Sequence, residues 1–199
     1  MALCALLVTS PAFAQAQQSP PVANNTLRLE LLKRFDQDQA IRNEIVPKGP
    51  DGVTDADWAR WRAVDADNTA RMKAIVQEYG WPSVSLVGRD GAEAAFTLVQ
   101  HADADHAFQV EMVQFVKKAA SAGELKAQDY ALLQDRVLVG EGKPQIFGTQ
   151  LRMVGQDLIP HSIEDEANVD RRRADVGLPS LAEYVAMARQ ALLSAKEVK

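Results

Sequence analysis

The sequence is almost free of cysteine, and this scarcity limits its chemistry. Among 199 residues the only cysteine is Cys4, which lies in an N-terminal segment that we expect to be removed. With no second cysteine, packing and polar contacts must hold the mature fold, because it contains no disulfide bond. The same absence excludes a thiol nucleophile and a Cys-x-x-Cys motif from the mature protein.

An excess of positive charge is missing as well. The chain has 22 lysines and arginines against 27 aspartates and glutamates, a net charge of −5. A surface that binds nucleic acid needs a basic face, so we expect no nucleic-acid partner. No stretch after the N-terminus is long and apolar enough to predict a stable membrane span. Gly-x-Ser-x-Gly, P-loop and Rossmann motifs are also missing, and nothing predicts a cofactor.

The first residues have the composition of an export signal. Residues 1–8 are nearly all apolar, and Ala12-Phe13-Ala14 has the small-x-small pattern of a signal-peptidase site. We therefore expect residues 1–14 to be a signal peptide, truncated because its basic beginning is missing, and the mature protein to be periplasmic or secreted. The alternative is a buried N-terminal segment. Residues 15–25, rich in Gln, Pro and Asn, predict a flexible leader.

Residues 26–195 predict a single mainly helical domain, a bundle with a small β-hairpin. Apolar residues at helical spacing predict helices over residues 26–46, 55–79, 94–103 and 124–139, after Ala104, around residues 170–176 and from residue 181. Ser83–Asp90 is predicted to be a loop. Two extended runs, 145–153 and 158–163, predict the hairpin. We expect Trp58 and Trp61 to lie in the core.

Polar residues interrupt the apolar stripes of the first two helices. Gln39 and Arg42 lie on the stripe of the first helix, and Asp65 and Asn68 lie on that of the second. A buried polar group without a partner costs about 1–3 kcal/mol. We therefore expect these four side chains to face inward and to join one hydrogen-bonded network.

His101 is the best candidate for acid–base chemistry, because an imidazole exchanges protons near neutral pH. It lies beside Gln100 at the polar end of an otherwise apolar predicted helix. Its partner should come from another element, because residues two apart on a helix point in different directions. The candidate partners are Asp65, Asp135, Asp165 and Asp170. The predicted catalytic residues are His101, Asp135 and Asp65. The alternative is a core histidine whose ring is bonded to a carboxylate or carbonyl.

Other polar residues are predicted to bind a substrate. Arginine can hold a carboxylate or phosphate through two parallel hydrogen bonds, and the alternative is pairing with an aspartate. The predicted binding residues are Gln39, Arg42, Asn68, Gln100, Arg136, Gln145, Gln150, Asp170 and Arg172. We expect a pocket around His101, bounded by the first, second, third and fifth helices and closed by the hairpin and the turn at residues 170–172. Arg173 is expected to be the most exposed arginine of its run.

A metal site is not predicted, although the sequence His101-Ala102-Asp103-Ala104-Asp105-His106 is similar to a metal-binding pattern. Ligands spaced by two residues suit a loop after a strand, whereas this stretch follows a predicted helix. Zinc sites also favour histidine and cysteine, and the chain has only three histidines.

Several short motifs together resemble a known family. They are Asp36-Gln37-Asp38-Gln39 with Arg42, Gly80-Trp81-Pro82, Gln100-His101-Ala102-Asp103, Asp135-Arg136, Gly148-Thr149-Gln150 and Asp170-Arg171-Arg172. The chain resembles, over residues 31–184, a family of bacterial proteins known only as a domain of unknown function. The resemblance supports these residues as a set and implies no reaction, cofactor or substrate.

Two functions fit these observations. The first is an exported enzyme that acts on a small polar or anionic substrate by acid–base chemistry at His101. The second is a non-catalytic envelope module that uses the same groups to bind a ligand or a partner. A concave pocket that holds His101 beside a carboxylate would favour the enzyme, and a flat polar surface would favour the module.

Overall fold

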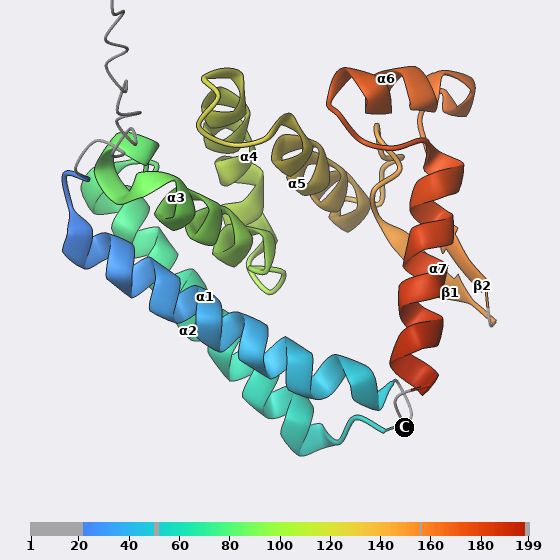
Figure 1. Ribbon diagram of the computed structural model, residues 1–199, viewed down its shortest axis with the longest axis horizontal. Helices are drawn as coiled ribbons and strands as arrows, with labels where there is room; N and C mark the ends of the chain where they lie inside the picture. Colours follow the sequence, from blue (N-terminus) through green and yellow to red (C-terminus); the bar gives the residue numbers. More distant parts are fainter. Residues whose placement is uncertain (1–21, 50–51, 156, 198–199) are drawn as a thin grey trace, which may run out of the picture.

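The computed structural model describes residues 22–49, 52–155 and 157–197, and side chains up to residue 193. Its helices are α1 (Asn25–Ile45), α2 (Asp55–Tyr79), α3 (Val84–Gln100), α4 (His106–Ser121), α5 (Ala127–Gly140), α6 (Val169–Asp175) and α7 (Leu181–Glu197), with short 3-10 turns η1 (Val46–Lys48) and η2 (Glu166–Asn168) (Figure 1). Strands β1 (Leu151–Val154) and β2 (Asp157–Pro160) form an antiparallel hairpin. The predicted mainly α fold is confirmed. The predicted signal peptide lies outside the described residues.

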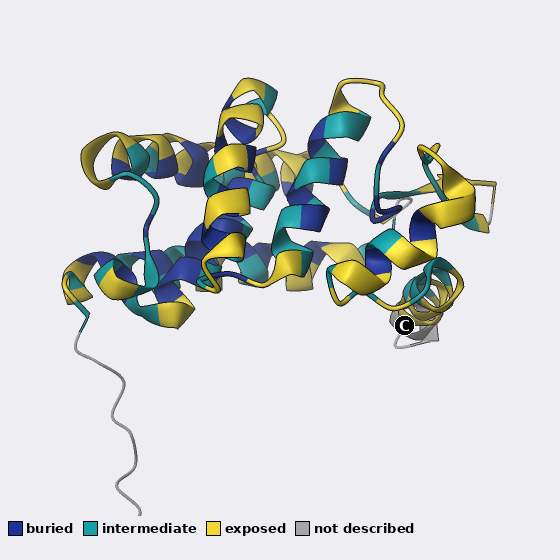
Figure 2. Cartoon of the chain, turned by 90° about the horizontal axis from the view of Figure 1, so that it is seen from above, coloured by how far each residue is buried: buried dark blue, intermediate teal, exposed yellow. Residues whose placement is uncertain are grey.

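The long helices α1 and α2 run side by side, and α3 packs against both of them (Figure 1). The starts of the first two follow from their caps, because Asn24 accepts the N–H of Leu27 and Thr54 forms a reciprocal capping box with Asp57. Buried residues gather where the helices face one another (Figure 2). No helix within the described ranges is long and apolar enough to cross a membrane.

The loop predicted over Ser83–Asp90 is wrong, because this stretch belongs to α3. Ser83 caps the helix by accepting the N–H of Leu86, and Gly88, with φ 75°, introduces a kink but not an end. The other end of α3 also differs from the prediction. The helix stops at Gln100, and His101 is its C-cap with φ −90° and ψ 5°. His101 therefore begins the turn between α3 and α4, which we call the 101–105 turn.

The segment before the hairpin is irregular and is held by a buried carboxylate. Asp135 on α5 is fully buried and accepts the N–H groups of Ile146, Phe147 and Thr149 at 2.7, 3.0 and 2.9 Å. The Thr149 hydroxyl donates to the same carboxylate at 3.0 Å. Gln145 forms an isolated parallel bridge with Ile163. The contacts with Asp135 explain why residues 146–149 form no strand, since three of their N–H groups bind a side chain in place of a neighbouring strand.

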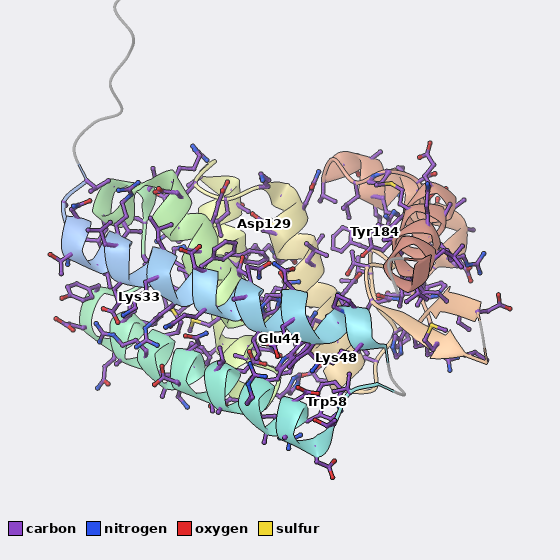
Figure 3. The ribbon with its side chains drawn as sticks, turned by 60° about the horizontal axis from the view of Figure 1, so that its bottom comes forward. Lys33, Glu44, Lys48, Trp58, Asp129 and Tyr184 are labelled. Carbon is purple, nitrogen blue, oxygen red and sulfur yellow. The ribbon has the colours of Figure 1, made fainter. Side chains whose placement is uncertain are left out.

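Arg173 holds the carbonyl groups of the same segment, and its predicted exposure is wrong. It is fully buried and donates to the carbonyl oxygens of Phe147 at 2.6 Å and Pro179 at 2.7 Å. Its guanidinium lies 4.8 Å from the ring centre of Tyr184, which points from α7 towards this segment (Figure 3). Burial lowers the pKa of Arg173. Tyr184 donates its hydroxyl to the carbonyl of Thr149 at 3.0 Å.

We expect Asp135→Asn to lower the free energy of unfolding by about 2 kcal/mol or more, because the amide replaces one acceptor oxygen with an NH2 group that faces buried N–H donors. Chemical denaturation of the full chain measures this change. The matched control is Asp36→Asn on the exposed side of α1, which should stay within about 0.5 kcal/mol of wild type. Equal stabilities of the two variants would contradict the role assigned to Asp135.

Candidate functional site

His101 is held by Asp38, a residue outside the predicted set of partners. Its Nδ1 lies 3.0 and 2.9 Å from the two carboxylate oxygens of Asp38. Asp38 is fully buried on α1, whereas the His101 side chain is 19% exposed. A carboxylate that is paired with arginine accepts hydrogen bonds, so Nδ1 carries the proton. Within the described part of the chain, Nε2 of His101 makes no hydrogen bond and is the atom left for chemistry.

Arg42 connects Asp38 with Asp65. Its Nη1 donates to Asp38 at 2.6 Å and its Nη2 donates to Asp65 at 2.9 Å. The guanidinium also lies 4.7 Å from the ring centre of Trp61, and Gln39 donates to Asp38 at 2.7 Å. Burial raises the pKa of Asp65, and the hydrogen bond from Arg42 opposes that rise. We give the name Asp38 cluster to the side chains of Asp38, Gln39, Arg42, Trp61, Asp65 and His101.

Helical spacing brings the Asp38 cluster together. Asp38 and Arg42 are four residues apart on α1, and Trp61 and Asp65 are four apart on α2, so each pair shares one helix face. The i,i+4 spacing of Asp38 and Arg42 was the available sequence signal for the missed carboxylate. Because both Nη atoms of Arg42 are occupied, this arginine positions Asp38 and presents neither atom as a clamp for substrate.

Asn68 lies outside the Asp38 cluster, so the prediction that it joins the same network is wrong. Its Oδ1 accepts a hydrogen bond at 3.2 Å from Arg34, which also donates to Asp67 and Glu30. Asn68 is one turn beyond Asp65 on α2. It lines a separate cavity of about 560 Å³ between α1 and α2.

The two tryptophans expected in the core lie at its edge. Trp58 is 41% exposed near the start of α2 (Figure 3). Trp61 is half-buried, with its ring centre 5.6 Å from that of Trp58. Trp61 therefore covers Arg42 from the solvent side of the cluster.

None of the four predicted partners of His101 binds it: Asp65, Asp135, Asp165 and Asp170. The carboxylate of Asp170 accepts the N–H of Leu181 at 2.7 Å at the start of α7. Asp165 accepts from Asn168 at 2.9 Å. The first of the four belongs to the Asp38 cluster through Arg42, and the second holds the segment before the hairpin. Asp38 takes their place because α3 ends directly over α1.

Two more predicted binding residues stabilise the hairpin region. Gln145 is fully buried and donates to the carbonyl oxygens of Gln150 and His161, both at 3.0 Å. Arg172 donates to the carbonyl oxygen of Ile146 at 2.9 Å. Gln145 and Gln150 both precede β1 and bind each other. Their contacts are those of a structural brace.

A second cavity lies between the 101–105 turn, α5 and the hairpin. Its volume is about 370 Å³, and it is lined by Asp103, His106, Gln109, Arg136, Val139, Gly140, Gln150, Leu151 and His161. We call it the Arg136 cavity. His101 is not among its lining residues, and Gln100 contributes a backbone carbonyl that accepts from Gln109 at 3.0 Å. His101 lines none of the cavities described here. The residues expected around a single pocket are therefore divided between the Asp38 cluster and this cavity.

The side chains of His101, Asp103 and Asp105 point to different partners and do not converge. Asp103 pairs with Arg136 on α5, and Asp105 caps α4 while pairing with Lys73 on α2 at 2.7 Å. Across the described ranges, no group of three or more His, Cys, Asp or Glu side chains could hold a metal ion.

A family model described as a family of unknown function, DUF6624, matches residues 25–196. The chain belongs to the DUF6624 family. The match extends from the start of α1 almost to the end of α7, so the DUF6624 domain includes both the Asp38 cluster and the Arg136 cavity. Neither the search of curated proteins nor the search of solved structures finds a match. Membership agrees with the resemblance to a domain of unknown function and assigns no activity.

In this DUF6624 chain, Asp38 and His101 have the geometry of an orienting carboxylate and a base. The carboxylate fixes the ring and its tautomer through Nδ1, which leaves Nε2 as the nitrogen that can accept a proton. The buried Asp38 is held in turn by Arg42 and Gln39. The arrangement can therefore move a proton at Nε2 while the rest of the cluster stays in place.

We expect the neutral form of His101 to carry its proton on Nδ1, because Asp38 accepts a hydrogen bond there. Two-dimensional NMR of the full chain with ¹⁵N-labelled histidine reports the tautomer. Asp38→Ala should remove this preference. His106, on the other side of the 101–105 turn, is the internal control and should keep its spectrum. A wild-type His101 that carries its neutral-form proton on Nε2 would disprove the assigned contact.

Proposed function

We propose that this protein is an exported enzyme that acts on a small polar or anionic substrate by acid–base chemistry at His101. The contact of Nδ1 with both oxygens of the buried Asp38, at 2.9–3.0 Å, carries the proposal. A pair of this kind recurs where an imidazole must accept a proton and return it. The partial exposure of His101 supports access to Nε2.

The roles within the proposed site follow from the contacts. His101 takes a proton from the substrate or from water through Nε2 and later returns it. Asp38 orients the ring and balances the charge of the imidazolium. Arg42 and Gln39 are positioning residues, because they hold Asp38 and need not touch the substrate. Asp65 balances the charge of Arg42.

The alternative is a non-catalytic envelope module that binds a ligand or a partner. Several predicted site residues favour it, because their polar groups are bonded within the protein and are not left to act on a substrate. Asp135, Gln145 and Arg172 hold the segment before the hairpin. The two functions differ in turnover, because only the enzyme changes its ligand chemically.

We expect His101→Gln to reduce turnover by about 10²–10⁴-fold, the usual contribution of a catalytic acid or base. The wild-type chain is incubated with a pooled library of small polar and anionic metabolites, and mass spectrometry identifies any compound that is consumed. The same reaction is then measured with His101→Gln and with Asp38→Asn. The second variant should also be slower, because it changes the group that orients the His101 ring.

The matched control is Asp36→Asn, which changes an exposed carboxylate two residues before Asp38 on α1, outside the Asp38 cluster, and should leave proton transfer at His101 intact. Denaturation curves of all variants separate lost chemistry from lost folding. Full turnover by a folded His101→Gln variant would contradict the enzyme. A wild-type chain that binds a library compound and leaves it unchanged would establish the module.

Export is the second part of the proposal, and Ala12-Phe13-Ala14 motivates it. We expect the native protein to begin at or near Gln15. Mass spectrometry of protein purified from its own cells, after separation of periplasm, medium and cytosol, measures both the first residue and the compartment. An intact Met1 on a cytosolic chain would refute export without affecting the reaction proposed at His101.

A further inference from the structure

The Arg136 cavity brings together cationic and imidazole groups from three separate parts of the chain. His106 begins α4, Arg136 lies near the end of α5, and His161 follows β2. The chain contains three histidines, and the two that are absent from the Asp38 cluster both line this cavity. Such a combination is unusual for a wall whose only task is packing, because apolar residues would fill the space without unpaired polar groups.

Arg136 is oriented by contacts behind it. Its Nη1 donates to both oxygens of Asp103, at 2.8 and 2.7 Å. Asp103 is held in turn by the amide of the buried Gln109 at 3.1 Å. These bonds occupy only one corner of the guanidinium. Within the described residues, Nε and Nη2 of Arg136 make no hydrogen bond, and these two atoms form the edge that binds oxyanions in a forked geometry.

His106 shows the same lack of partners. Its Nε2 and the Nε of Arg136 are both buried atoms without a hydrogen-bond partner in the part of the chain that the structure describes. The ring packs so closely against Gly140 that a Cβ there would lie 2.7 Å from Cε1. Glu141 lies close enough to His106 for an electrostatic interaction, but its carboxylate is paired with Lys143 at 2.8 Å. The ring is therefore fixed in the cavity wall with its hydrogen-bonding capacity unused.

We infer that the Arg136 cavity binds the oxyanion group, a carboxylate or a phosphate, of a small molecule. Arg136 supplies the charge and the N–H groups of its unoccupied Nη2, and His161 supplies a further imidazole. The Nε of Arg136 and the Nε2 of His106 are buried beside this surface without a hydrogen-bond partner in the described residues. Asp103 balances part of the positive charge of Arg136. The site should therefore select its ligand by the geometry of hydrogen bonds more than by net charge. This site goes beyond the proposed function, because binding there needs no proton transfer at His101.

Titration of the full-length chain with inorganic phosphate and, separately, with succinate tests the site and distinguishes the two sources of oxyanion. The readouts are heat of binding at constant ionic strength and the ¹⁵N signals of His106 and His161. We expect at least one probe to bind in the millimolar range or tighter. Arg136→Gln should weaken that binding by about tenfold or more, since a charge-assisted hydrogen bond is lost.

The matched control is Arg152→Gln, which removes an exposed arginine from β1 of the same hairpin and should leave binding unchanged. Arg136→Gln should remain folded, because the partner it abandons, Asp103, has a 61% exposed side chain. His161→Ala gives a second test away from α5 and should also weaken binding. His101→Gln should bind as wild type does, which keeps this inference separate from the proposed reaction.

Two results would overturn the site. One is the absence of binding by both probes at millimolar concentration. The other is equal loss of affinity in Arg136→Gln and Arg152→Gln, which would reduce the interaction to unspecific attraction by surface charge. Binding of phosphate alone or of succinate alone would support the site and name the class of its ligand.

Discussion

A buried carboxylate determines how the first three helices meet. Asp38 is fully buried, and an isolated ionised carboxylate in a protein interior costs several kcal/mol unless other groups compensate it. Its compensation comes from three directions: Arg42 on the same helix, the neighbouring Gln39, and His101 at the end of α3. The contact with His101 fixes the C-terminal end of α3 against α1. The need to compensate the buried charge of Asp38 therefore determines where the candidate base, His101, lies.

The hairpin depends on a similar solution, a buried carboxylate on α5. Asp135 accepts the N–H groups of the segment before β1, and Arg173 donates to its carbonyl groups. An irregular segment is thereby satisfied from both sides without pairing to a strand. The two fully buried charges act on the backbone between them, and this explains why several residues that look like site residues in the sequence serve the fold.

The sequence predicts those features that depend on local rules. The capping box of Thr54 and Asp57 and that of Ser180 and Glu183 both start helices. The mainly helical fold follows from periodicity in the same way. Local rules also selected His101, because a polar residue at the end of an apolar helix needs a partner.

The features that the sequence does not predict depend on tertiary contacts. Carboxylates are rarely fully buried, so Asp38 was read as part of a polar motif and not as the partner of His101. Arg173 belongs to a run of three arginines, which is typical of a solvated face, yet it is buried because loop carbonyl groups surround it. Neither outcome can be inferred from spacing, since both depend on segments distant in sequence.

The 101–105 turn explains why the two candidate sites can be separate and still act in one protein. His101 binds α1, Asp103 binds α5 and Asp105 binds α2, so three alternate residues reach three different helices. Their spacing looks like that of metal ligands, but it arises because successive side chains leave an irregular turn in different directions. A turn held at three points has little freedom to move. It therefore keeps the proposed base and the proposed oxyanion site at a fixed separation, which is the rigidity that positioned chemistry requires.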